Sequence, residues 1–286
     1  MIDLHTHSSA SDGADSPSLL LETALNSGLK AIALTDHDTV SGIEEFLDAA
    51  ENKNIEAIAG VELSTYGANR ELHIVGLFVD HSSPALLAYL EKMRLTRNAR
   101  NEEMLAKINA IGYPITREEV LECAGGESVG RPHFAQALIK RGYFPDTKEV
   151  FERLLKRGRR AYISRFHPPA KESIDVIHTA GGLAIWAHPI SMQREGDCKS
   201  KHLRKALDQL TSFGLDGIEV CYSQYTPLQE EMLRGLAGEY NLLSSGGSDY
   251  HGHHIPGILP GTGKGSLIVP DTFLESLKKA RLEKFG

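Results

Sequence analysis

The segment Ile2-Asp3-Leu4-His5-Thr6-His7 joins a short apolar run to two histidines that are separated by one residue. Residues two apart in a β-strand lie on the same face, so His5 and His7 can bind one metal ion together. The segment therefore predicts a strand at the N-terminus that delivers imidazole ligands to the point where it meets a loop.

The same arrangement recurs along the chain, where further histidines and carboxylates follow apolar runs. A carboxylate such as Glu62 is costly at the end of a buried strand, and bridging two ions would offset that cost. Any one histidine is more often a core or surface residue, but nine coincidences favour a cluster of divalent metals. The nine predicted ligands are His5, His7, Asp12, His37, Glu62, His73, His188, Asp249 and His251.

The apolar runs themselves predict an α/β protein. Strands are expected at about 2–4, 30–34, 55–61, 72–79, 183–186, 217–221 and 242–245. Helix-like segments lie between them, at 17–28, 40–52, 171–180, 201–213 and 227–240. Continuous apolar strands separated by helices are typical of a mostly parallel sheet covered by helices. Ligands at the carboxyl ends of strands favour a distorted seven-stranded β/α barrel, which carries its active site on that face.

Between residues 81 and 162 the alternation stops. Helices are expected at 84–111, from Thr116, around 132–140 and at 147–156, with a turn at Gly125-Gly126 and no strand. The sequence therefore predicts a barrel formed by residues 1–80 and 163–286, with residues 81–162 as a helical insertion that forms a lid for the substrate.

Composition limits the class of protein. The 286 residues are 41% hydrophobic and 24% charged, as in ordinary globular proteins. No apolar run is long enough to span a bilayer, and no leader-like segment begins the chain, which favours a cytoplasmic protein without membrane contact. Cys123, Cys198 and Cys221 have no CxxC spacing, which argues against a disulfide framework. The net charge of −7 argues against binding long duplex nucleic acid.

The ordered motifs resemble those of the polymerase-and-histidinol-phosphatase (PHP) family of metal-dependent phosphoesterases. The motifs are Asp3-x-His5-x-His7, Thr35-Asp36-His37-Asp38, Gly60-Val61-Glu62, the strand histidine His73, Ala187-His188-Pro189 and Ser248-Asp249-Tyr250-His251. The resemblance implies two or three divalent ions, with manganese expected first and iron, zinc or magnesium as alternatives. It also implies three sites, formed by His5, His7, Glu62 and Asp249, by Glu62, His73 and His188, and by Asp12, His37 and His251.

Within the family, the helical insertion is similar to that of a branch acting on nucleotides. The branch removes the 3′-phosphate of 3′,5′-bisphosphonucleotides or degrades short RNA from its 5′ end. The resemblance therefore implies a hydrolase acting on phosphoric esters through a metal-activated hydroxide. The residues expected to act directly in catalysis are Asp12, His37, Glu62 and His251.

Basic residues of the insertion are the predicted substrate contacts. Arg97, Asn98 and Arg100 lie on one long helix, where residues three or four apart share a face. Arg131 and His133 begin a helix after Gly130, a position that suits phosphate. The alternatives are a solvated charged face for the first three residues and a simple helix start for the last two.

Three functions compete at this stage. The first is a phosphoesterase for nucleotides or short 5′-phosphorylated RNA, and the second is a phosphatase for a metabolite such as histidinol phosphate. The third is a metal-binding accessory module without turnover. The general acid also stays open between His133, Asp12 and a metal-bound water.

Overall fold

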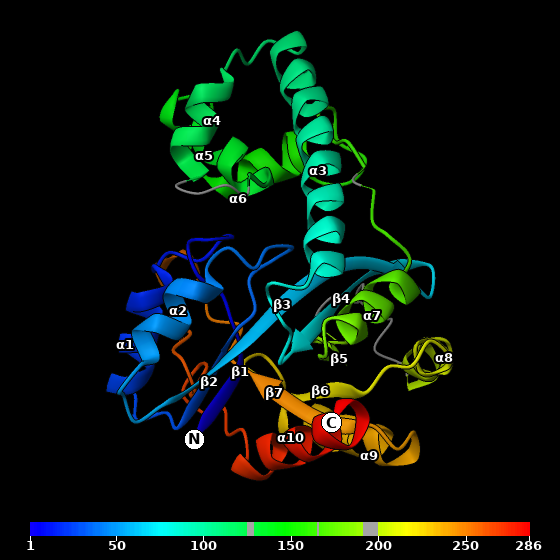
Figure 1. Cartoon of the computed structure of the whole chain (residues 1–286). Helices are drawn as coiled ribbons and strands as arrows, with labels where there is room; N and C mark the ends of the chain where they lie inside the picture. Colours follow the sequence, from blue (N-terminus) through cyan, green and yellow to red (C-terminus); the bar gives the residue numbers. More distant parts are fainter. Residues whose placement is uncertain (125–128, 165, 191–199) are drawn as a thin grey trace. The chain divides into compact units, whose positions relative to one another are not determined.

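The computed structural model describes residues 1–124, 129–164, 166–190 and 200–286. The chain divides into two compact units, drawn in Figure 1. The first, which we call the barrel unit, contains Met1–Tyr89 and His167–Gly286, and the second, the helical unit, contains Leu90–Phe166. The predicted boundaries at residues 80 and 163 and the lid role of the insertion stay predictions.

One seven-stranded sheet forms the centre of the barrel unit, with its strands in sequence order. Its strands are β1 (Ile2–Thr6), β2 (Ala31–Leu34), β3 (Glu56–Gly67), β4 (Arg70–Leu77), β5 (Leu183–Trp186), β6 (Gly217–Tyr222) and β7 (Leu243–Gly247). The chain after β7 returns to β1, because Asp249 N donates to His5 O and His7 N donates to Tyr250 O, each at 2.9 Å. The sheet is thus a nearly closed barrel, which confirms the predicted seven-stranded fold.

The strand β4 runs against the direction of its neighbours. Parallel pairing joins β1 to β2, β2 to β3, β5 to β6 and β6 to β7, whereas β4 is antiparallel to both β3 and β5. The cause is a tight hairpin at Ala68-Asn69, whose φ values of 48° and 64° are those of a two-residue turn that matches strand twist. The prediction had placed a longer connection there and had ended β3 at Val61.

This hairpin corrects two expectations about ligand positions. Glu62 does not end its strand, since β3 continues to Gly67. The parallel pairing of β3 with β2 stops at Ala59, and Glu62 lies just beyond, in the part of β3 that pairs with β4. His73 does not follow a strand either, because it is the fourth residue of β4. Since β4 is antiparallel, its first half reaches the edge of the barrel that the other strands reach with their last residues.

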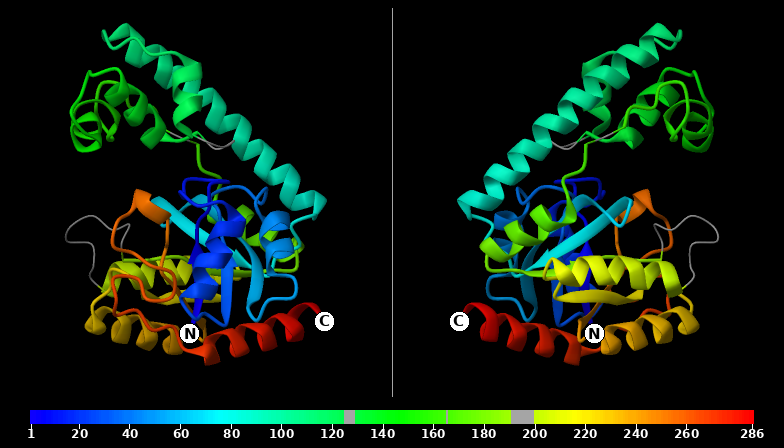
Figure 2. Two further views of the ribbon diagram at one scale, coloured as in Figure 1. Left: turned by 90° about the vertical axis from the view of Figure 1, so that its left-hand side faces the viewer. Right: turned by 90° about the vertical axis from the view of Figure 1, so that its right-hand side faces the viewer.

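Six helices lie around the strands in the described part of the barrel unit, and Figure 2 shows them from two sides. They are α1 (Pro17–Asn26), α2 (Ile43–Ala50), α7 (Ala170–Thr179), α8 (Ser200–Ser212), α9 (Pro227–Glu239) and α10 (Asp271–Phe285). As predicted, Ser16 caps α1 by accepting a hydrogen bond from Leu19 N, and Pro17 is its first residue. A short 3₁₀ turn, η2 (Gly252–His254), follows β7.

The helix α10 was not predicted. Only Leu274 and Leu277 are buried in it, whereas Leu282 is exposed, so the sequence lacks a clear apolar stripe. The helix joins the two ends of the chain, because the Met1 amino group lies 3.3 Å from Asp271 Oδ1.

The helical unit contains only helices in its described part, as predicted. The long helix α3 (Pro84–Ala110) enters from the barrel unit and is followed by α4 (Arg117–Ala124), α5 (Arg131–Lys140), α6 (Thr147–Val150) and the π-helical turn η1 (Phe151–Leu155). The predicted helix at 147–156 is therefore divided between two helix types. The core of the unit includes Met104, Ile108, Phe134, Leu138 and Leu154.

Two findings bear on the composition arguments. No helix in the described ranges is long and apolar enough to cross a membrane. Cys123 and Cys221 are free thiols, whereas Cys198 and the predicted turn at Gly125-Gly126 lie outside the described residues.

Candidate metal centre

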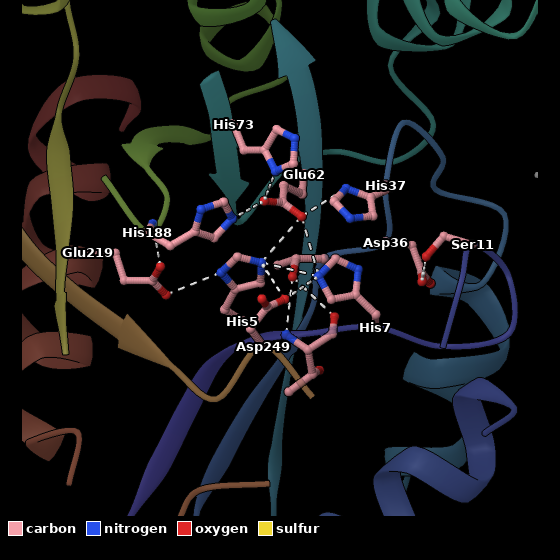
Figure 3. Close-up of polar contacts among 12 residues, drawn as sticks. His5, His7, Ser11, Asp36, His37, Glu62, His73, His188, Glu219 and Asp249 are labelled. Carbon is pink, nitrogen blue, oxygen red and sulfur yellow. Dashed lines mark hydrogen bonds and ion pairs between the residues drawn. The ribbon is translucent and has the colours of Figure 1, made fainter. Parts of the chain in front are cut away.

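Glu62 stands at the centre of the predicted ligands (Figure 3). Its side chain is fully buried. Its Oε1 lies 2.8 Å from His73 Nδ1 and 2.9 Å from His188 Nε2. One carboxylate oxygen is therefore shared by an imidazole from β4 and an imidazole from the loop that follows β5.

The second oxygen, Glu62 Oε2, faces three other histidines. It lies 2.9 Å from His37 Nδ1 and 3.3 Å from Nε2 of both His5 and His7. The ligands from β1, β2 and β3 thus meet at this atom, since His37 follows β2 and pairs as a single β-bridge with Glu62.

The remaining predicted ligands come from the loops after β1 and β7. Asp249 Oδ1 lies 3.1 Å from His7 Nε2. His251 Nε2 lies 3.3 Å from Asp12 Oδ1, and His37 Nε2 lies 3.9 Å from Asp12 Oδ2. The side chain of Asp12 is 37% exposed, so this side of the cluster is open to solvent.

Four groups within the described residues could each hold a metal ion. They are His7, Asp12, His37 and His251; His5, Glu62 and His188; His5, His7 and Asp249; and His37, Glu62 and His73. All nine predicted ligands occur in these groups. Their division among ions differs in part from the three predicted sites, and the role of each residue as a ligand stays a prediction.

The donor atoms of the cluster are arranged better for binding a metal ion than for hydrogen bonds with one another. Nε2 of His5 and Nε2 of His7 are 3.1 Å apart, and each neutral ring can place at most one proton. Glu62 Oε2, His7 Nδ1 and His37 Nδ1 are buried without a well-aligned hydrogen bond. Ligands about 2.0–2.2 Å from a tetrahedral ion lie about 3.3–3.6 Å from each other, close to the separations between donor atoms in this cluster.

The buried charges shift the pKa values of the cluster in opposite directions. Burial opposes ionisation of Glu62, but His37, His73 and His5 outweigh it and hold the pKa of that carboxyl well below its usual range. Burial also disfavours the charged form of His5, yet Glu62, Glu219 and Asp249 raise its pKa well above the usual value. The pocket therefore favours anionic oxygens that attract cations.

Asp36 supports the loop that carries Asp12. The buried carboxylate of Asp36 accepts hydrogen bonds from Ser8 N at 2.8 Å, from Ser8 Oγ at 2.6 Å and from Ser11 Oγ. Figure 3 draws Asp36 and Ser11 to one side of the histidines. Asp36 belongs to the Thr-Asp-His-Asp motif, but its contacts hold the loop of residues 8–15.

Sequence reasoning missed two residues of the site. Glu219 on β6 is buried beside His5 and His188, and Tyr222 at the end of β6 donates to Asp249 Oδ2 at 2.8 Å. A carboxylate within the apolar run Ile218-Glu219-Val220 could have been found by the argument used for Glu62. Nothing in the local sequence distinguishes Tyr222 from an ordinary core tyrosine.

The predicted substrate contacts all lie in the helical unit. Arg97, Asn98 and Arg100 are on α3, where Arg100 is buried, and Asn98 lines a cavity of about 230 Å³. Nδ1 of His133 accepts a hydrogen bond from Gly130 N at 3.1 Å, so this ring caps its own helix. The guanidinium of Arg131 lies 6.0 Å from the ring centre of Tyr162. Their contact with a substrate stays a prediction.

Comparison with known proteins gives consistent matches. The PHP domain model matches residues 3–163. A 5′-3′ exoribonuclease of Haemophilus influenzae is 38% identical over 249 residues, which cover 87% of this chain and 89% of that protein. A 3′,5′-nucleoside bisphosphate phosphatase of Chromobacterium violaceum is 32% identical over 251 residues, 87% of either chain. A solved structure from Bifidobacterium adolescentis superposes with a TM-score of 0.84 at 28% identity, covering 98% of this chain and 96% of that one.

Proposed function

The chain belongs to the PHP domain family and is a phosphoesterase, and on that premise we propose that its substrates are phosphorylated nucleotides. The proposed reaction is hydrolysis of the 3′-phosphate of 3′,5′-bisphosphonucleotides, of short 5′-phosphorylated RNA from its 5′ end, or of both. The relatives named for these two activities resemble this chain over most of its length, which supports the proposal.

The observation that carries the proposal is the position of Glu62. It belongs to two of the candidate groups, one with His5 and His188 and one with His37 and His73. A carboxylate whose oxygens face separate sets of imidazoles is suited to bridging two cations, and phosphoryl transfer is a reaction that paired cations promote.

Each part of the site has a task in this proposal. The histidines and carboxylates would hold the ions, and Glu62 would keep them at a fixed separation. When bound, divalent cations polarise phosphoryl oxygens and lower the pKa of a nearby water. Asp12, His37 and His251, on the solvent-exposed side, would orient the phosphate and handle protons there. The donors are imidazole and carboxylate without thiolate, which suits manganese, iron or zinc.

We assign the second phosphate of the substrate to basic residues of the helical unit. Arg131 is the first residue of α5, where its guanidinium fork lies at the positive end of a helix and suits an anion. Arg97 and Arg100 on α3 would add charge. Under this proposal, these basic residues favour substrates that carry two phosphates.

The substrate class can be tested directly. Manganese-loaded protein is compared on adenosine 3′,5′-bisphosphate, a short 5′-phosphorylated RNA and histidinol phosphate, with phosphate or nucleotide release as the readout. Release from the first two but little from the third is expected. Preference for histidinol phosphate would overturn the nucleotide proposal. If protein with verified metal content released nothing from any of the three compounds, all three would be excluded as substrates.

The role of Arg131 has a matched control in the same unit. Arg131 lies near the ring of Tyr162, and Arg153 lies 5.2 Å from the ring centre of Phe144. Arg131→Ala is expected to reduce kcat/KM on the bisphosphonucleotide about 10- to 100-fold, the loss of one charge-assisted contact, with little effect on an aryl phosphate. Arg153→Ala should change neither, and an equal effect of Arg131→Ala on both substrates would contradict the assignment.

A further inference from the structure

Glu219 is a buried carboxylate beside the candidate metal centre but outside its four groups. Figure 3 shows it next to His5 and His188, on the side away from His37. No lysine or arginine in the described part of the chain forms an ion pair with it. A buried carboxylate without such a partner needs other hydrogen-bond donors, so its contacts reveal what it holds in place.

One oxygen of Glu219 fixes the ring of His5. Glu219 Oε1 lies 3.1 Å from His5 Nδ1. A carboxylate at this distance favours the tautomer with its proton on Nδ1, which leaves the lone pair on Nε2. That Nε2 lies 3.3 Å from Glu62 Oε2 and 3.6 Å from Asp249 Oδ1. The ring is thus held with its donor atom toward the cluster.

The other oxygen of Glu219 fixes the backbone of His188. Glu219 Oε2 accepts a hydrogen bond from His188 N at 2.6 Å. His188 has a φ of 29°, which is unfavourable for a residue with a side chain and needs support from its surroundings. In this conformation His188 Nε2 lies 2.9 Å from Glu62 Oε1.

We propose that Glu219 is a positioning residue that holds His5 and His188 together for one metal ion with Glu62. This inference rests on the proposed function, because it presumes that the group formed by His5, Glu62 and His188 binds a cation. Glu219 itself does not touch the metal or the substrate. Its carboxylate contacts His5 through one oxygen and His188 through the other.

The variant Glu219→Gln tests the proposal with almost no change in shape. A glutamine has one acceptor oxygen and one amide donor, so it can accept from His5 Nδ1–H or from His188 N–H but not from both. Affinities for manganese and for zinc are measured by titration of the metal-free protein, together with metal content after dialysis. A loss of affinity of about 10- to 100-fold for one ion per chain is expected, as for other partners of metal-binding histidines.

Asp216→Asn, at the residue directly before β6, is the matched control. Asp216 also accepts from a histidine ring and a backbone amide, since its Oδ2 lies 2.7 Å from His178 Nε2 and 2.8 Å from Ala184 N. It precedes β6, whereas Glu219 lies within it. Asp216→Asn is expected to keep metal affinity unchanged while lowering stability. Equal affinity of wild-type protein and Glu219→Gln, or an equal loss in both variants, would overturn the proposal.

A measurement on wild-type protein covers the case in which Glu219→Gln does not fold. In zinc-loaded protein, ¹⁵N spectra of the His5 ring should show Nδ1 protonated and Nε2 bound to the ion. Zinc bound through Nδ1 would overturn the role of Glu219. A failure of the proposed function would give a different result from a failure of the role of Glu219. Wild-type protein would then bind neither manganese nor zinc at these residues, or would bind them without hydrolysing any nucleotide.

Discussion

The phenol of Tyr222 donates a hydrogen bond to Oδ2 of Asp249 at 2.8 Å. Burial and the nearby carboxylate raise the pKa of Tyr222, so the phenol keeps its proton and remains a donor. The other oxygen, Asp249 Oδ1, is left facing His7 Nε2 at 3.1 Å. Tyr222 therefore selects which oxygen of Asp249 is available to a metal ion.

We expect Tyr222→Phe to weaken metal binding while the fold survives. Without the phenol, Asp249 can rotate and present either oxygen, and a loss of about 10-fold in metal affinity is typical of such a partner. The measurement is titration of metal-free protein with manganese. Tyr240→Phe is the control, because Tyr240 also donates to a carboxylate, Asp208 Oδ1 at 2.7 Å, on the surface. Equal affinities for the two variants would contradict the role of Tyr222.

Removal of the central charge should have the largest effect. Glu62→Gln keeps the shape of the side chain but replaces one acceptor oxygen by an amide donor, which cannot bind a cation. We expect metal content to fall and hydrolysis to drop by more than about 100-fold, beyond the loss of an outer partner. Glu56→Gln, at the exposed start of the same strand, removes only a surface ion pair with Lys278 and should change little. Full metal content in Glu62→Gln would refute the bridging role.

The loop that carries Asp12 depends on Gly13. A Cβ atom at this position would lie 2.5 Å from the carbonyl oxygen of His7 and 2.9 Å from the carbonyl carbon of Ser8. Gly13→Ala should therefore displace the loop at a cost of about 1–3 kcal/mol and reduce hydrolysis. Thermal unfolding and turnover are measured together.

Gly235→Ala provides the comparison for this substitution. Gly235 lies in α9, where an added Cβ would meet nothing within 4 Å. Alanine should stabilise that helix by about 0.5–1 kcal/mol and leave turnover unchanged. If Gly13→Ala behaved in the same way, the proposed dependence of Asp12 on its loop would be wrong.

The sequence predicted the architecture because each signal was local. Short apolar runs and helix caps such as Ser16-Pro17 depend only on residues that are close together in the chain. The spacing of His5 and His7 likewise lies within a short local segment. The hairpin at Ala68-Asn69 escaped prediction, since neither residue is the glycine that usually occupies such a turn. The helix α10 was not predicted because it buries too few apolar residues to give a clear helical periodicity in the sequence.

The support of the site could not be predicted in the same way. Glu219 meets His5 across 214 positions of the chain, and this contact exists only because the barrel closes between β1 and β7. His188 likewise has a positive φ and donates its backbone N–H to Glu219, a partner 31 positions away in the chain. Which residues are candidate ligands could be inferred from local motifs, whereas the residues that orient them depend on tertiary structure.

The acid stability of the barrel unit should depend on Asp216. Its carboxylate lies 2.7 Å from His178 Nε2 and 2.6 Å from Lys284 Nζ, joining α7 and α10. Burial alone would raise the pKa of Asp216, but these partners outweigh it and hold the pKa below the ordinary value of 3.8. The ionised form is thus favoured more in the folded protein than in the unfolded chain.

The sign of the pH dependence follows from that lowered pKa. The contribution of Asp216 is complete above its ordinary pKa and is lost as pH falls through the lowered value of the folded state. Asp216→Asn should therefore reduce the free energy of unfolding by about 1.5–3 kcal/mol near neutral pH, the range for hydrogen bonds to a charged group. Urea unfolding of both proteins across a pH series measures the difference, which should shrink in strong acid. A difference that stayed constant into strong acid would mean that the charge of Asp216 contributes nothing and that only its shape matters.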